Sequence, residues 1–139
     1  MKFRFPIVII DEDYRSENTS GLGIRALAKA IENEGFEVVG VTSYGDLSQF
    51  AQQQSRASAF ILSIDDEEFV ASGPELDPAA VLNLRKFIEE VRRKNEDVPI
   101  YLHGETKTSQ HLPNDILREL HGFIHMFEDT PEFVAKHII

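Results

Sequence analysis

Phe5-Pro6-Ile7-Val8-Ile9-Ile10-Asp11-Glu12-Asp13-Tyr14 is the stretch that decides the fold, because four β-branched residues run directly into three acids. Unbroken Ile/Val runs are typical of parallel strands whose sheet is covered by helices on both faces. Acids at the carboxyl end of such a strand lie where open α/β sheets place their sites. We therefore predict a central strand with an acidic tip.

The composition indicates one packed domain. The chain has 139 residues, 42% of them hydrophobic, including ten Phe, which suits a single core and excludes a disordered chain. It has no cysteine, which excludes disulfides, thiolate metal sites and a cysteine nucleophile and fits an intracellular protein.

The net charge of the chain argues against nucleic acid and anionic lipid as partners. With 24 acids against 14 bases the formal net charge is −10, and such a surface repels nucleic acid and anionic lipid. No apolar run approaches the roughly 20 residues of a membrane span, and the N-terminus does not fit a signal peptide. We expect a cytoplasmic protein with no nucleic-acid or membrane partner.

Strand and helix patterns alternate along the rest of the chain. Further strands are predicted over 36–42, 59–64, 99–102 and 123–127. Helices are predicted from Ile24 to Gly35, from Asp46 through Gln54, after Asp77-Pro78, after Pro113 and after Thr130-Pro131. This alternation predicts an α/β fold of three layers, a flavodoxin-like or receiver-like (βα)5 unit with a parallel sheet of order 2-1-3-4-5.

This pattern resembles the phosphoryl-receiver domains of two-component signalling. In that family an acidic pair after strand one holds Mg²⁺, an Asp ending strand three accepts the phosphoryl group, and a Lys ends strand five. Asp11 and Glu12 match the acidic pair. Ile64 stands at the acceptor position, so Asp65 reaches it only if the third strand slips or bulges by one residue.

The fifth strand region, 122–127, contains no Lys, so a phosphoaspartate would lack its main charge partner. We therefore interpret Asp11, Glu12 and Asp65 as a vestigial acidic pocket. An atypical response-regulator receiver, acting as a signalling switch, is the alternative function.

Other candidate sites favour structural interpretations. The five histidines show no ligand spacing, and we expect His125, inside an apolar strand, to be a hydrogen-bonded structural residue. Ser20-Gly21-Leu22-Gly23 is a fragment of a phosphate loop, better interpreted as a flexible start of a helix. Residues 65–68 favour a solvated acidic turn over a calcium loop. We predict no catalytic, cofactor-binding or metal-ligating residue in this chain.

The segment from Glu119 to Ala135 resembles a second family, and its Glu128-Asp129-Thr130-Pro131-Glu132-Phe133 stretch is the specific part. It is similar to the end of the N-terminal "wing" domain of bacterial inducible ornithine/lysine/arginine decarboxylases, most closely the arginine branch. The final helix ends on two isoleucines without a C-terminal signal, as we expect of a domain cut from a longer chain. The resemblance implies that residues 1–139 form one receiver-like wing domain, a fragment of a larger enzyme.

The resemblance also implies where the chemistry lies. Such enzymes hold pyridoxal phosphate on a lysine in a Ser-x-His-Lys setting, and none of the six lysines here has it: Lys2, Lys29, Lys86, Lys94, Lys107 and Lys136. We expect this chain alone to be no enzyme and the parent to be a basic amino-acid decarboxylase active in acid stress. The implied partners are the parent's other domains and subunits in a homo-oligomer, and a nucleotide effector stays open.

Overall fold

The structure, a computed structural model, describes residues 6–11, 13–42, 57–63, 78–94, 97–104, 112–125 and 129–138. Its elements are β1 (Ile7–Ile10), α1 (Thr19–Asn33), β2 (Val38–Val41), β3 (Ala59–Ser63), α4 (Pro78–Lys94), β4 (Ile100–Gly104), α6 (Asn114–Glu119), β5 (Gly122–His125) and α7 (Pro131–Ile138). The strands form one parallel sheet of order β2-β1-β3-β4-β5. The predicted α/β fold and strand order are confirmed.

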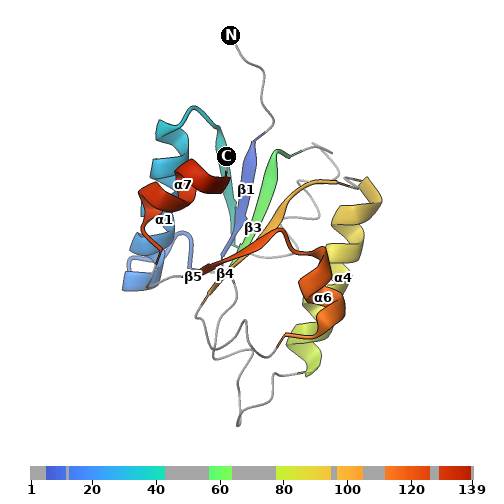
Figure 1. Ribbon diagram of the computed structural model, residues 1–139. Coiled ribbons are helices and arrows are strands. Elements are labelled where there is room, and N and C mark those ends of the chain that lie inside the picture. The colour runs from blue at the N-terminus through green and yellow to red at the C-terminus, as the bar shows by residue number, and fades with distance from the viewer. Residues whose placement is uncertain are drawn as a thin grey trace.

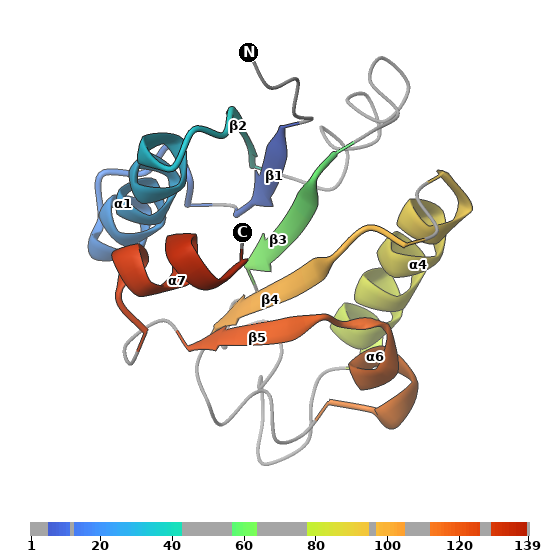
Figure 2. The same ribbon diagram turned by 45° about the horizontal axis from the view of Figure 1, so that its top comes forward.

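The sheet lies between two layers of helices (Figure 1), and Figure 2 shows α1 and α7 together on one of its faces, with α4 and α6 on the other. Strand side chains alternate between the faces. Ile7, Ile9 and Ile61 pack with α1 and α7, whereas Val8, Ile10 and Leu62 pack with α4 and α6. The domain therefore has two apolar layers that share one sheet.

β1 is the most enclosed strand of this arrangement. Its four side chains are between 0% and 4% exposed, and it pairs with β2 on one edge and β3 on the other. Burial on both faces explains why its sequence is an unbroken apolar run instead of an alternating one.

The helix boundaries follow local signals. α1 begins at Thr19, earlier than the predicted Ile24, because the Asn18 side chain accepts the Gly21 N–H at 2.8 Å and caps it. Gly35 follows this helix with φ of 97°, as its predicted place after the C-terminus requires. α4 and α7 begin at the predicted prolines, Pro78 and Pro131. No helix in the described part of the chain is long and apolar enough to cross a membrane.

Two other sequence expectations differ in outcome. The helix predicted over 46–54 lies outside the described residues. The short helix after Pro113 is confirmed as α6, and it buries Ile116 while Leu117 lies exposed.

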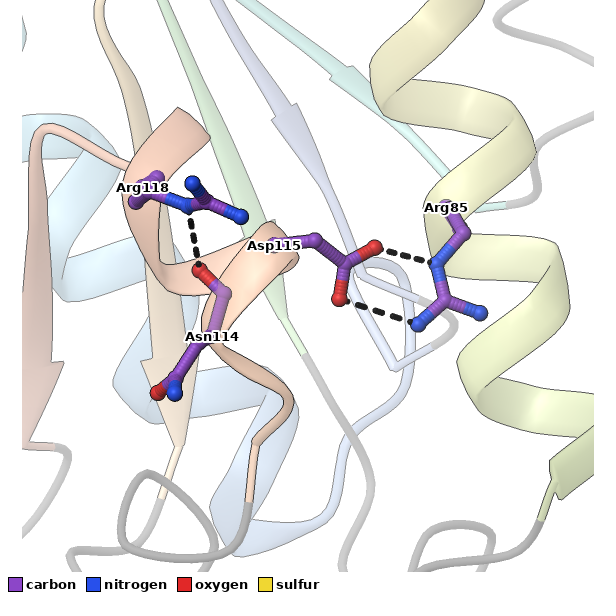
Figure 3. A network of polar contacts seen from close by, with 4 residues as sticks. All are labelled: Arg85, Asn114, Asp115 and Arg118. Atoms are coloured by element: carbon purple, nitrogen blue, oxygen red, sulfur yellow. Dashed lines mark hydrogen bonds and ion pairs between the residues drawn. The ribbon is translucent and has the colours of Figure 1, made fainter.

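Ion pairs join α4 to α6. Arg85 donates to both carboxylate oxygens of Asp115, at 2.6 and 3.1 Å, while Arg118 donates to the Asn114 carbonyl within α6 (Figure 3). The hydrogen bond from Arg85 holds the pKa of Asp115 below its usual range. Arg92 pairs with Glu119 at 3.0 Å. These exposed pairs align the two helices, and the apolar residues beneath them supply most of the stability.

Gly40 on β2 lies directly under the Tyr14 ring, and a Cβ there would overlap three ring atoms. Gly40→Ala should therefore destabilise the domain by about 1–3 kcal/mol, as overpacking does. Chemical denaturation monitored by circular dichroism measures the change.

Tyr14→Ala is the matching background, since it removes the ring that the new methyl would meet. There Gly40→Ala should cost nothing, because alanine is the better residue in a strand interior. An equal loss of stability in both backgrounds would contradict the packing of Tyr14 on Gly40.

Candidate functional site

Polar side chains form a row at the carboxyl edge of the sheet. Ile10 pairs with Leu62 and Leu62 with Leu102, so the next residues along these strands are Asp11, Ser63 and His103. Ser63 and His103 are themselves register partners. Strand alternation places the row on the α1/α7 face of the sheet.

Asp11 is buried, with 7% of its surface exposed. Its backbone N–H donates to the Val41 carbonyl at 3.0 Å and extends the β1–β2 ladder. Its Oδ1 accepts the Asp13 N–H at 2.8 Å, and its carbonyl accepts the Tyr14 N–H at 3.0 Å. The carboxylate therefore helps to shape the turn after β1.

The predicted acidic pocket is only partly placed by the structure. Asp11 lies at the expected edge, while Glu12 and Asp65 lie outside the described residues. The grouping of these three carboxylates stays a prediction. Among the residues that are described, no three Asp, Glu or His side chains gather closely enough to hold a metal ion.

The segment between β1 and α1 is held by its own side chains. Asp13 Oδ1 accepts hydrogen bonds from the Ser16 hydroxyl at 3.2 Å and the Asn18 amide at 3.3 Å. Arg25, in the second turn of α1, donates from Nη1 to the carbonyls of Tyr14 and Ser16 at 2.7 and 2.8 Å. Asp13 thus binds neighbouring residues of its own loop.

Residues 20–23 begin a helix, as predicted, and they lie within α1 itself. A Cβ on Gly21 would overlap the carbonyl oxygens of Ser16 and Asp13, whereas nothing lies within 4 Å of a Cβ on Gly23. Gly21 is therefore needed for close packing of the loop on the helix. Its partners were invisible in the sequence because they depend on how the loop folds back.

Ser63 and His103 join β3 to β4 within the row. The Ser63 hydroxyl and His103 Nδ1 lie 2.9 Å apart, and the tautomer of the ring decides which of them donates. His103 is 9% exposed, and burial lowers its pKa from 6.5 to about 4. At neutral pH its imidazole is uncharged.

Sequence reasoning missed this pair. It ended the fourth strand at Leu102 and singled out His125 as the histidine inside an apolar strand, but β4 continues to Gly104 and buries His103. Ser63 and His103 are 40 residues apart in the chain. The contact depends on the register in which β3 pairs with β4. The sequence does not specify that register.

Gly21→Ala should destabilise the domain by about 1–3 kcal/mol, because its methyl meets the backbone carbonyls of Ser16 and Asp13, of which Arg25 holds that of Ser16 in place. Gly23→Ala is the matched control and should stabilise it by up to about 1 kcal/mol, through helix propensity alone. Thermal and denaturant unfolding measure both. Equal effects at the two glycines would contradict the close approach at Gly21.

Comparison with known proteins places the chain by sequence. The model of the family "Orn/Lys/Arg decarboxylase, N-terminal domain" matches residues 19–139. The chain is 22% identical over 138 residues to lysine decarboxylase LdcA of Pseudomonas aeruginosa, covering 97% of this chain and 17% of the relative. It is 22% identical over 135 residues to the biodegradative arginine decarboxylase of Escherichia coli, covering 96% and 17%. Equal identities do not favour the predicted arginine branch.

Solved structures agree on the fold. Lysine decarboxylase A from Pseudomonas aeruginosa superposes with a TM-score of 0.77 at 20% identity, over 99% of this chain and 18% of that one. The chemotaxis response regulator CheY4 of Vibrio cholerae superposes with a TM-score of 0.62 at 15% identity, over 98% and 97%. The fold is thus that of receiver domains, and the chain spans less than a fifth of the decarboxylases that it resembles.

The family match covers most of the chain, including the last helix and the Glu128–Phe133 stretch that carried the resemblance. This protein therefore belongs to the family of Orn/Lys/Arg decarboxylase N-terminal domains.

Proposed function

We propose that this chain is a non-catalytic, receiver-like domain of a pyridoxal-phosphate-dependent ornithine, lysine or arginine decarboxylase, and that it serves assembly or regulation of that cytoplasmic enzyme. The family match over residues 19–139 is the observation that carries the proposal. In the relatives, the matching region occupies 17% of the chain, which leaves ample length for a separate catalytic part.

The lysines do not fit the cofactor. Lys29, Lys86 and Lys136 lie exposed on helices, where a Schiff base would be open to water and to hydrolysis. None of the chain's six lysines stands in a Ser-x-His-Lys sequence. We assign pyridoxal phosphate, which supplies the electron sink for decarboxylation, to the rest of the parent enzyme.

An exposed aromatic residue supports a role in contacts between domains or subunits. Phe133 on α7 is 51% exposed and belongs to the stretch that is specific to the family. Its backbone is fixed, since the Phe133 N–H donates to Thr130 Oγ1 at 3.2 Å and caps the helix. Aromatic side chains held in this way are frequent anchors at protein interfaces.

Assembly of the full-length parent enzyme tests the proposal. Phe133→Ser should weaken subunit association roughly tenfold or more while leaving kcat per active site unchanged. Analytical ultracentrifugation and a decarboxylation assay measure the two quantities. Lys136→Ser, an exposed change one turn along α7, is the matched control and should have no effect.

Removal of residues 1–139 should likewise change the assembly state or its regulation and spare the chemistry. Loss of catalysis at an intact active site, with assembly unaffected, would refute a non-catalytic role.

The charge of −10 makes a pH dependence of this assembly a further part of the proposal. Protonation of like-charged carboxylates relieves repulsion between subunits. The oligomer of the parent enzyme should therefore be favoured at mildly acidic pH over neutral pH. An assembly state that does not change across this range would count against the electrostatic role.

The receiver fold keeps a signalling switch as the second candidate, since CheY4 matches over 97% of its length. We expect no stable phosphate adduct when the chain is incubated with Mg²⁺ and acetyl phosphate, because residues 122–127 contain no Lys to stabilise a phosphoaspartate. Intact-mass spectrometry measures this, with Asp11→Asn as the control. A stoichiometric adduct that is lost in this variant would establish the switch instead.

A further inference from the structure

The contact between Ser63 and His103 joins two members of the polar row at the carboxyl edge of the sheet. His103 lies opposite Ile124 of β5 in the strand register, and Tyr101, two residues earlier on the same face, is buried in the α1/α7 core. The His103 ring is held at Nδ1 by Ser63. The pair joins neighbouring strands at the last register position of β3.

Protonation of His103 changes the hydrogen bonds and the charge of this pair. A neutral imidazole both donates and accepts a hydrogen bond, so it suits the Ser63 hydroxyl in either tautomer. An imidazolium donates from both nitrogens and carries a charge that burial penalises. An imidazolium can still donate to the Ser63 oxygen, but its charge is costly where the ring is buried. We therefore expect the protonated ring to turn toward water and to leave Ser63.

The charged groups on the surrounding elements are already engaged or face solvent. Asp11 at the end of β1 accepts from Asp13, and Arg25 on α1 donates to two carbonyls. Among the side chains whose burial the structure describes on the two helices of this face, the remaining titratable groups are exposed: Lys29 and Glu32 on α1, and Glu132 and Lys136 on α7. Burial is the cause of the lowered pKa of His103, so these groups do not offset it.

We propose that Ser63 and His103 form an acid-sensitive latch between β3 and β4, which opens the carboxyl edge of the sheet when His103 takes up a proton. The opening is local, because the α4/α6 core does not contain the pair. It gives the domain a response to acid that is separate from the surface carboxylates.

The stability of the latch depends on pH because His103 binds a proton more weakly in the folded domain than in the unfolded chain. Since the pKa of His103 falls from 6.5 to about 4 on folding, the latch is stable above pH 6.5 and is progressively lost as the pH falls toward 4. Between pH 7 and pH 5 the equilibrium constant for edge opening should rise roughly twentyfold. Amide hydrogen exchange of the 139-residue chain should show this loss of protection at Ser63 and Gly104, with protection at Leu84 and Ile88 of α4 unchanged.

His103→Asn separates the latch from general acid effects, because it keeps a polar atom near Nδ1 and cannot become charged. In this variant edge protection should be the same at pH 7 and pH 5, while the exposed His121→Asn control keeps the wild-type response. Loss of protection in His103→Asn equal to that of wild type would overturn the proposal.

A measurement on the unmodified chain needs no variant. Imidazole carbon chemical shifts followed by nuclear magnetic resonance should show His103 titrating well below pH 6. Titration at or above pH 6.5 would overturn the latch.

Discussion

Burial of β1 on both faces is the constraint on which the other elements depend. Its four apolar side chains are almost wholly enclosed, and each contributes roughly 1.5–3 kcal/mol only if a neighbour covers it. Alternation sends them to opposite faces, so no single layer of helices is enough. α1 and α7 cover Ile7 and Ile9, and the α4/α6 layer covers Val8 and Ile10. Parallel pairing with β2 and β3 then makes crossover connections necessary.

The same strand delivers its acids to the carboxyl edge, where a receiver domain would perform chemistry. Here Asp11 binds a backbone amide and Asp13 binds two side chains of its own loop. Arg25 secures the loop through two carbonyls. In the described part of this edge, the two aspartates of a receiver-like fold thus make structural contacts.

The polar residues of the domain divide into two environments. The ion pairs between α4 and α6 are exposed, so water and salt weaken them. His103 lies where solvent is largely excluded, so its protonation state is tied to the integrity of the sheet. Salt therefore weakens the ion pairs, whereas burial sets the protonation of His103.

The sequence by itself determined the α/β class, the strand order and the starts of α4 and α7. These depend on periodicity and on Pro, Thr and Gly signals that act within a few residues. The family could also be identified from the stretch from Glu128 to Phe133. Only the tertiary structure decided the contact of Ser63 with His103, the overlap that makes Gly21 necessary, and the clamp by Arg25. The first depends on the register between two strands and the other two on how the loop folds back onto α1, and a local pattern carries no information on either.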